Sequence, residues 1–240
     1  MIPDEPVYAL FSGGKDSFAT AKMLQEADKL RGVVMIDTGM SVPEWKQTCI
    51  DICEQFRMPY HIIPTNVRYE WFVWKYGFPG SGGHAYAMNY LKGRAIREYK
   101  KQFPGIALAS GVRLAESARR ALTTKELGDF EGVPVHAPIF GWSTQQVWAY
   151  VRGFGYERPK SYVTLGTSGD CLCGAYARDE EREALSVHYP AVASRIRLIE
   201  ETVQTIHPTR CRWGWSALSN ADRATQSTSE MLICQECSGK

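Results

Sequence analysis

The stretch SGGKDS, residues 12–17, lies between a short apolar run and a helical pattern. Its glycine pair lets the backbone approach a ligand closely, and the free amides at the start of a helix attract anions. The alternative is an ordinary strand-to-helix turn, but two hydroxyls and a lysine beside the glycines favour phosphate binding. The spacing differs from the Walker loop, which needs four residues between its first glycine and Gly-Lys. We expect the phosphates at Ser12, Gly13, Gly14, Lys15, Asp16 and Ser17.

Cysteines form a second group with chemical potential. Five of the seven lie in the last third of the chain, and clustered thiols of this kind favour a metal site bound by four cysteines, either zinc or an iron–sulfur cluster. We expect four of these five to be ligands: Cys171, Cys173, Cys211, Cys234 and Cys237. Cys49 and Cys53 instead share the apolar stripe of one helix, which predicts two buried side chains.

The elements that must position these residues alternate between strands and helices. Apolar strand patterns occur at 7–11, 32–37, 60–64 and 106–110, and helical patterns at 17–30, from 43, at 84–103 and from 143. Ser143 and Gln146 have the spacing of a capping box. Residues 64–83 are aromatic and glycine-rich and are expected to form a long loop. The alternation predicts an α/β fold with a doubly wound, mostly parallel sheet.

The character of the sequence changes near residue 160, where strand patterns stop and cysteines begin. We therefore expect two regions: residues 1–160 form the nucleotide-binding domain, and residues 161–240 form a small, Cys-rich, mainly helical metal-binding region.

Composition narrows the class of protein. The chain has 240 residues, is 44% hydrophobic and carries a net charge of +2, so no general basic field indicates nucleic acid. It shows neither a signal-peptide pattern nor an apolar stretch of membrane-spanning length. We expect a cytoplasmic protein with no membrane contact.

Four motifs, in order, resemble one family. SGGKDS is similar to the PP-loop of the ATP pyrophosphatases and of the phosphoadenylylsulfate (PAPS) reductases. MIDTGMSVPEW (35–45), GVRLAESARR (111–120) and PIFGWSTQQVWAYV (138–151) resemble stretches of the reductase branch. The resemblance therefore covers about residues 7–152.

The resemblance implies an adenine nucleotide at the carboxyl ends of the strands, with adenine against the backbone near Met35. It implies cleavage at the α-phosphate, assisted by the charges of Lys15, Asp16 and Arg113. Besides the loop, the expected nucleotide contacts are Met35, Asp37, Gly111, Arg113, Glu116 and Arg120. Without the resemblance, the last three would be assigned to a solvated helix face. Asp16 and Asp37 are candidates for Mg²⁺, although either could instead cap a turn.

The chain ends CQECSGK and lacks the Glu-Cys-Gly-Leu-His tail of the sulfonucleotide reductases. This favours an ATP pyrophosphatase that activates a substrate for sulfur transfer, as in DNA phosphorothioation or base thiolation. The alternatives are a PAPS or adenylyl-sulfate reductase that releases sulfite, and a non-catalytic nucleotide-binding subunit. Related enzymes with four-iron clusters favour [4Fe–4S] over zinc, and the fifth cysteine is then a candidate sulfur-handling thiol. The resemblance also allows a cysteine desulfurase or other sulfur donor, a nucleic-acid substrate and a homodimer.

Overall fold

Six strands form one sheet in the order β3-β2-β1-β4-β6-β5. The computed structural model describes residues 2–116 and 126–216. Neighbouring strands are parallel except for the antiparallel pair β5–β6. The strands are β1 (Val7–Leu10), β2 (Leu30–Asp37), β3 (Tyr60–Pro64), β4 (Leu108–Ala109), β5 (Leu127–Phe130) and β6 (Val133–His136). This confirms the predicted α/β fold with a mostly parallel sheet.

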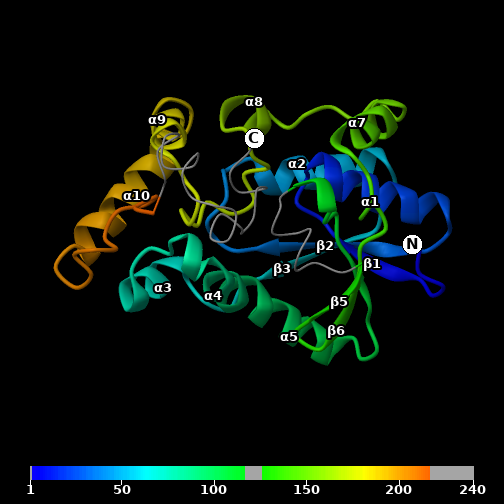
Figure 1. Ribbon diagram of the computed structural model, residues 1–240, viewed down its shortest axis with the longest axis horizontal. Coiled ribbons are helices and arrows are strands. Elements are labelled where there is room, and N and C mark those ends of the chain that lie inside the picture. Colours follow the sequence, from blue (N-terminus) through cyan, green and yellow to red (C-terminus); the bar gives the residue numbers. More distant parts are fainter. Residues whose placement is uncertain (1, 117–125, 217–240) are drawn as a thin grey trace.

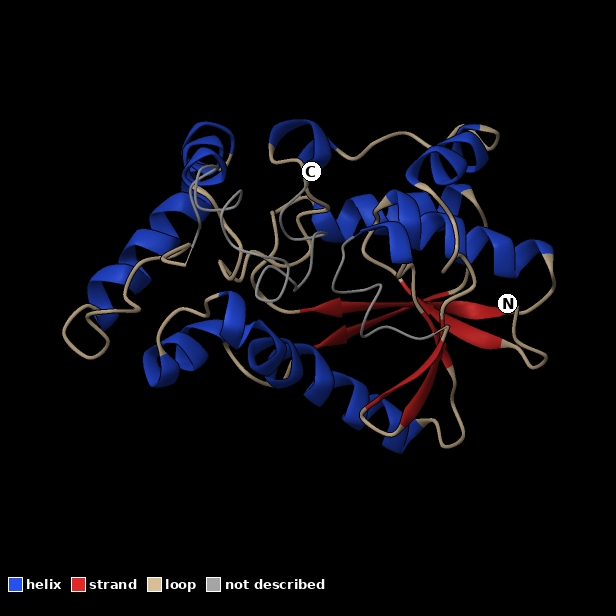
Figure 2. Ribbon diagram, viewed as in Figure 1, coloured by secondary structure: helices blue, strands red, loops and turns tan. Residues whose placement is uncertain are grey.

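Helices cover both faces of this sheet (Figures 1 and 2). α1 (Lys15–Glu26), α2 (Trp45–Gln55) and α7 (Thr144–Arg152) lie on one face. The other face carries α3 (Tyr69–Tyr76) and a continuous helical stretch made of α4 (His84–Met88), the π-helical turn η2 (Asn89–Gly93) and α5 (Arg94–Gln102). Each helix buries an apolar stripe: α1 buries Phe18, Ala21 and Leu24, and α5 buries Ala95, Ile96 and Tyr99.

The strand order contains a reversal at β1. The chain runs from β1 to β2 and β3 in one direction, and β4 then returns to the other side of β1. In open α/β sheets, ligands bind in the crevice at the carboxyl ends of strands where the order reverses. The loop at residues 12–17 follows β1 directly and therefore lies at this switch point.

The last described helices lie toward the carboxyl ends of the strands. They are α8 (Lys160–Thr164), α9 (Asp179–His188) and α10 (Pro190–Val203). In Figure 2 the arrows of β2 and β3 point toward the side on which α9 and α10 lie. Apolar side chains from both sides of residue 160 share one core cluster, including Phe18 and Ile196. The division into two domains stays a prediction.

Two sequence expectations need correction. Residues 64–83 do not form one long loop, because α3 lies within them and buries Tyr69, Phe72 and Val73. The sheet also has an antiparallel hairpin, β5–β6, beyond the four expected strands. Among the described residues, no helix is both long and apolar enough to cross a membrane.

Candidate functional site

The loop between β1 and α1 is tied to the protein through its carbonyl groups. Trp45 donates its indole N–H to the carbonyl of Ser12 (2.9 Å), and the Tyr156 hydroxyl donates to the carbonyl of Gly13 (2.7 Å). Inside the loop, the Ser17 hydroxyl donates to the carbonyl of Gly14 (2.9 Å). The carbonyl dipoles of three consecutive residues are thus neutralised from the protein side.

The amide groups of the same loop are used differently. The amides of Ser12 and Gly14 make only long contacts, 3.3 and 3.4 Å, with the hydroxyls of Ser17 and Ser12 respectively. Among contacts between described residues, the amides of Gly13, Lys15 and Asp16 donate to no acceptor. Unsatisfied amides at a helix N-terminus form an anion site. The loop thus offers free amides where the sequence predicts phosphate, and the phosphate site stays a prediction.

Gly13 has a backbone conformation in the loop that favours glycine. Its φ is +79°, a region that favours glycine, and a Cβ there would lie 2.9 Å from the sulfur of Cys49. Cys49 and Cys53 are fully buried on the inner stripe of α2, as predicted, and burial raises the pKa of both thiols, that of Cys53 to about 12. The Cys49 side chain, which is neutral, therefore packs against the loop at Gly13.

A buried ion pair joins the loop to the segment that follows β4. Arg113 Nε lies 2.7 Å from Oδ1 of Asp16, and both side chains are almost completely buried. Lys15 Nζ lies 2.5 Å from the other oxygen, Oδ2. The Arg113 guanidinium also donates to the carbonyl of Trp142 (3.2 Å) and the hydroxyl of Thr144 (3.3 Å). The three residues predicted to be catalytic thus form one chain of charges.

The backbone after β4 approaches the first turn of α1 very closely. A Cβ at Gly111 would lie 2.7 Å from the carbonyl carbon of Asp16 and 2.9 Å from the amide nitrogen of Ser17. Only a residue without a side chain allows this approach. Gly111 therefore belongs to the loop as a packing residue.

The end of β2 offers backbone groups to the site. The Phe11 amide donates to Val34, and the Thr65 amide donates to Asp37. Backbone groups of successive residues in a strand point to opposite neighbouring strands. The N–H and C=O of Met35 therefore point toward β3, and those of Ile36 point toward the β1 side, beyond the point where β1 ends. Among described residues, neither backbone group of Ile36 has a hydrogen-bond partner on that side. The backbone of Met35 is engaged with β3, so Ile36 is better placed than Met35 to offer backbone groups to a ligand.

Asp37 ends β2 and accepts hydrogen bonds from two groups. They are the amide of Gly39 at 2.9 Å and Nζ of Lys46 at 2.6 Å. Burial raises the pKa of Asp37, but these hydrogen bonds and the Lys46 charge outweigh it and hold the pKa below its ordinary value. Both Asp16 and Asp37 thus have cationic partners.

A segment from the Cys-rich region closes the same edge of the sheet. Asp170 accepts hydrogen bonds from Lys92 and Ser168, both at 2.7 Å, and its carbonyl accepts from Thr38. Leu172 donates its amide to the carbonyl of Met40 (2.7 Å). Sequence reasoning did not select Lys92 or Asp170 for this edge, and no local pattern joins two residues so far apart in the chain.

A hollow of about 370 Å³ opens at the carboxyl ends of β2 and β3. Asp37, Thr38 and Gly39 form one side, and residues 64–70 and Arg195 form the rest. Arg195 donates to the carbonyl of Gly39 (2.7 Å) and forms an ion pair with Glu70. The hollow is large enough for part of a small substrate and has both polar and apolar walls.

The predicted cysteine ligands are described only in part. Cys171 is half-buried and Cys173 is buried, and their segment is fixed by Trp213, whose indole N–H donates to the carbonyl of Leu172 (2.9 Å). Cys211 lies two residues before Trp213. Within residues 2–116 and 126–216, no three His, Cys, Asp or Glu side chains group to hold a metal ion. Cys234 and Cys237 lie outside the described residues, so the thiol set suits a soft metal in its chemistry and the ligand set stays a prediction.

The two other predicted nucleotide contacts differ in what the structure gives. Glu116 ends the short 3₁₀ turn η3 (Leu114–Glu116), and Arg120 lies outside the described residues. His84, at the start of α4, is buried, and its ring lies 5.1 Å from that of Tyr176. Its Nδ1 has no hydrogen-bond partner within the part of the chain that the structure describes.

Residues 6–162 match the model of the phosphoadenosine phosphosulfate reductase domain. The chain belongs to this family. It is also 29% identical, over 146 residues, to an uncharacterized protein of Methanocaldococcus jannaschii, covering 59% of this chain and 34% of that protein. The chain thus spans about a third of that relative's length. Membership of the reductase-domain family supports a nucleotide-binding enzyme of the PP-loop class.

Two solved structures resemble this reductase-domain chain in fold. NMN synthetase from Francisella tularensis matches with a TM-score of 0.51 and 15% identity, over 82% of this chain and 87% of that one. The U34-tRNA thiolase NcsA from Methanococcus maripaludis, with its [4Fe-4S] cluster, matches with a TM-score of 0.50 and 16% identity, over 84% and 72%. At these identities the comparisons show the shared fold.

Proposed function

We propose that the protein binds ATP at the switch point and cleaves it at the α-phosphate. An oxygen of the acceptor attacks the α-phosphorus, the bond to the bridging oxygen of the β-phosphate breaks, and pyrophosphate leaves. The acceptor carries AMP as a leaving group and is thereby activated for sulfur transfer. The proposal rests first on the loop amides of Gly13, Lys15 and Asp16, which meet the positive end of α1 at the carboxyl end of β1.

Lys15 is the charged side chain best suited to touch the phosphates. Negative charge grows on the α-phosphate oxygens and on the departing pyrophosphate, and preorganised donors stabilise such charge. Asp16 orients the ammonium group of Lys15, and a buried ion pair with Arg113 fixes Asp16. We therefore assign Asp16 and Arg113 as positioning residues, and Lys15 as the catalytic residue.

The backbone N–H and C=O of Ile36 would bind the adenine edge, which presents both an acceptor and a donor. This refines the expected contact at Met35 by one residue, because alternate residues of a strand face opposite neighbours. Gly111 allows the close packing that sets the loop. Because Asp16 and Asp37 are engaged with cations, any Mg²⁺ would reach the site with the nucleotide phosphates and water, and no step here depends on it.

Sulfur transfer to a nucleic acid is the acceptor chemistry that we favour, in line with the fold shared with a tRNA thiolase. The sulfur would come from a cysteine desulfurase or another donor. Four of the five C-terminal cysteines would hold the [4Fe–4S] cluster, or zinc as the alternative. The cluster would supply redox-active iron.

Family membership favours a second candidate, a reductase that releases sulfite from PAPS or adenylyl sulfate. A non-catalytic nucleotide-binding subunit is the third, and the intact charge chain of Lys15, Asp16 and Arg113 counts against it.

Product analysis separates these candidates. The purified protein is incubated with ATP and Mg²⁺, and separately with adenylyl sulfate or PAPS and a thiol reductant, and both are analysed for nucleotides and for sulfite. AMP and pyrophosphate from ATP support the proposal. Sulfite release without ATP cleavage identifies the reductase, and bound but unchanged nucleotide identifies the non-catalytic subunit.

A further inference from the structure

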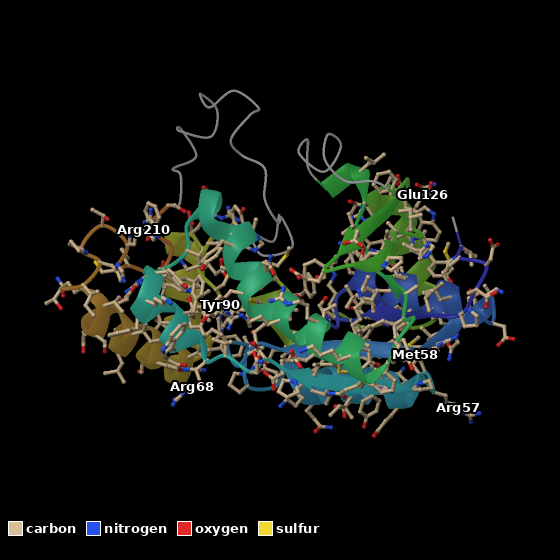
Figure 3. All side chains as sticks on the ribbon, turned by 90° about the horizontal axis from the view of Figure 1, so that it is seen from below. Arg57, Met58, Arg68, Tyr90, Glu126 and Arg210 are labelled. Atoms are coloured by element: carbon tan, nitrogen blue, oxygen red, sulfur yellow. The ribbon has the colours of Figure 1, made fainter. Side chains whose placement is uncertain are left out.

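A basic and aromatic surface covers the helices on the face of the sheet opposite α1. Residues 65–102 contain seven Lys or Arg and only two Glu, a net charge of +5 in a chain whose total is +2. We name this surface, formed by α3, α4, η2 and α5, the aromatic face. Figure 3 views the molecule from this side, with Tyr90 labelled between Arg68 and Arg210.

Cations and rings alternate on the aromatic face. The ring of Trp71 stacks on that of Tyr90, with centroids 6.0 Å apart and planes 12° apart. Lys75 Nζ lies 5.0 Å from the Trp71 ring centroid, and the Arg94 guanidinium lies 3.9 Å from that of Tyr90. Such contacts fix charged groups beside flat apolar surfaces.

Three rings on this face are unusually exposed for their size. The exposed fractions of Trp71, Trp74 and Tyr86 are 44%, 50% and 52%. Large aromatic side chains are normally covered, and exposed apolar patches mark interaction sites. Exposed rings beside cations offer faces to planar groups that carry negative charge.

The aromatic face also contains a hollow of about 320 Å³. The glycine-rich turn at residues 77–83 lines it, together with Phe72, Tyr76, Tyr86, Arg210 and Trp215. The Arg210 guanidinium lies 5.9 Å from the Trp215 ring centroid. The position of a Cβ at Gly82 or Gly83 is open, so a ligand can approach the backbone there.

We propose that the aromatic face binds an unpaired segment of RNA, with bases against the exposed rings and phosphates beside the Lys and Arg side chains. Stacking on aromatic side chains in a basic groove is how single-stranded nucleic acids are bound. The charge argues against an apolar protein partner, and folded RNA regularly presents unpaired bases, whereas DNA exposes them only when its duplex opens.

The aromatic face is connected to the candidate site. α3 begins with Tyr69 and Glu70, which line the 370 Å³ hollow at the end of β2, and Trp71 and Trp74 follow in the same helix. Lys92, on η2, reaches the same edge of the sheet through Asp170. RNA on α3 would therefore place a nucleotide near the switch point, and this role as acceptor rests on the proposed function.

Binding is measured by fluorescence anisotropy of a labelled single-stranded RNA, without ATP. The test variants are Trp71→Ala with Trp74→Ala, and Lys75→Glu. The matched controls are Tyr60→Ala, an exposed ring on the edge strand β3, and Arg31→Glu, an exposed charge at the start of β2. We expect each test variant to weaken binding by about tenfold or more, since each lost stack or phosphate contact has that order of effect, and the controls to change it by less than about twofold.

Salt and strand type give independent readouts. Binding should weaken steeply as salt rises, and Lys75→Glu should reduce that slope. Single-stranded DNA of the same sequence and duplex RNA should bind more weakly. The proposal is overturned if RNA does not bind, if DNA or duplex RNA binds as tightly, or if the controls weaken binding as much as the test variants.

Failure here is distinguishable from failure of the proposed function, because pyrophosphate release from ATP is measured in a separate reaction that contains no RNA. Thermal melting of each variant checks that it is folded. Lys75 is a surface residue, so its variant keeps the test decisive even if the tryptophan variant loses stability.

Discussion

Arg113 Nε and Asp16 Oδ1 are 2.7 Å apart, and each side chain is 2% exposed. The pair joins the segment after β4 to the first turn of α1, across the point where the strand order reverses. It also leaves the second oxygen of Asp16 for Lys15. The orientation of the lysine at the phosphate loop thus depends on an arginine that is itself covered.

Breaking this pair should be costly. Asp16→Ala or Arg113→Ala alone breaks a buried ion pair, which typically lowers the free energy of unfolding by about 3–5 kcal/mol. Arg113→Ala should cost less than Asp16→Ala, because Lys15 still faces Asp16. The double variant should lose less than the sum of the two, because both single variants remove the same interaction. Urea denaturation of all three variants measures these losses in the free energy of unfolding. As a control, breaking the exposed Glu98–Lys101 pair should cost less than about 1 kcal/mol. Additive losses would show that the two residues act independently.

Gly111 should tolerate no side chain. Gly111→Ala places a methyl group 2.7 Å from the Asp16 backbone, and overpacking of this kind typically costs about 1–3 kcal/mol. It should also reduce pyrophosphate release, because α1 must shift at its first turn. Gly141→Ala is the matched control, since its Cβ would meet nothing within 4 Å. Equal effects of the two substitutions on stability and turnover would contradict the packing role.

The sequence predicted well those features that depend on neighbours in the chain. Strand β3 and the capping box of Ser143 and Gln146 are present as predicted. The helical stretch at 84–102 is also present, although η2 gives it a π-helical turn. In each case the local pattern and the final packing favour the same structure.

Features that depend on distant contacts were not predictable in this way. The glycine-rich sequence around α3 predicted a loop. The helix forms because Tyr69, Phe72 and Val73 are spaced so that one helical face buries all three against the core. The pairing of Arg113 with Asp16 joins residues 97 apart. No sequence spacing specifies which charge that arginine meets.

Acid should weaken the Asp170 link. Burial raises the pKa of Asp170, but the Lys92 charge and the hydrogen bonds from Lys92 and Ser168 outweigh it and lower the pKa below its ordinary value of 3.8. Its stabilising contribution is therefore full above that value and is lost as pH falls through the lower folded-state pKa. At pH values below about 4, the free energy of unfolding of the wild type should therefore decrease.

Asp170→Asn tests this link. The variant should be less stable than the wild type at pH 7, by on the order of 1–3 kcal/mol, because hydrogen bonds to a charged group are lost. The difference should shrink as pH falls. Glu98→Gln, on an exposed carboxylate, is the control. A difference that stays constant from pH 7 to pH 3 would rule out the charge as its cause.

Metal content should depend on the C-terminal thiols alone. Protein purified without oxygen should bind iron and absorb near ~400 nm, as thiolate-bound clusters do. Both signals should be lost in four of the five single serine variants, made at Cys171, Cys173, Cys211, Cys234 and Cys237. Cys49→Ser should preserve them, because burial raises the pKa of the Cys49 thiol and keeps it protonated. A colourless protein with one zinc would contradict the cluster, and loss of metal in Cys49→Ser would contradict the ligand assignment.

The position of bond cleavage tests the central claim most directly. ATP is replaced by two analogues in which carbon substitutes for a bridging oxygen, and nucleotide products are separated by chromatography. The β,γ-methylene analogue should still yield AMP, and the α,β-methylene analogue should be inert. Lys15→Gln should lower the AMP yield by about 100-fold or more, the size typical of losing a preorganised charge partner. Turnover of the α,β-methylene analogue to an ADP analogue and phosphate, with an inert β,γ-methylene analogue, would contradict cleavage at the α-phosphate.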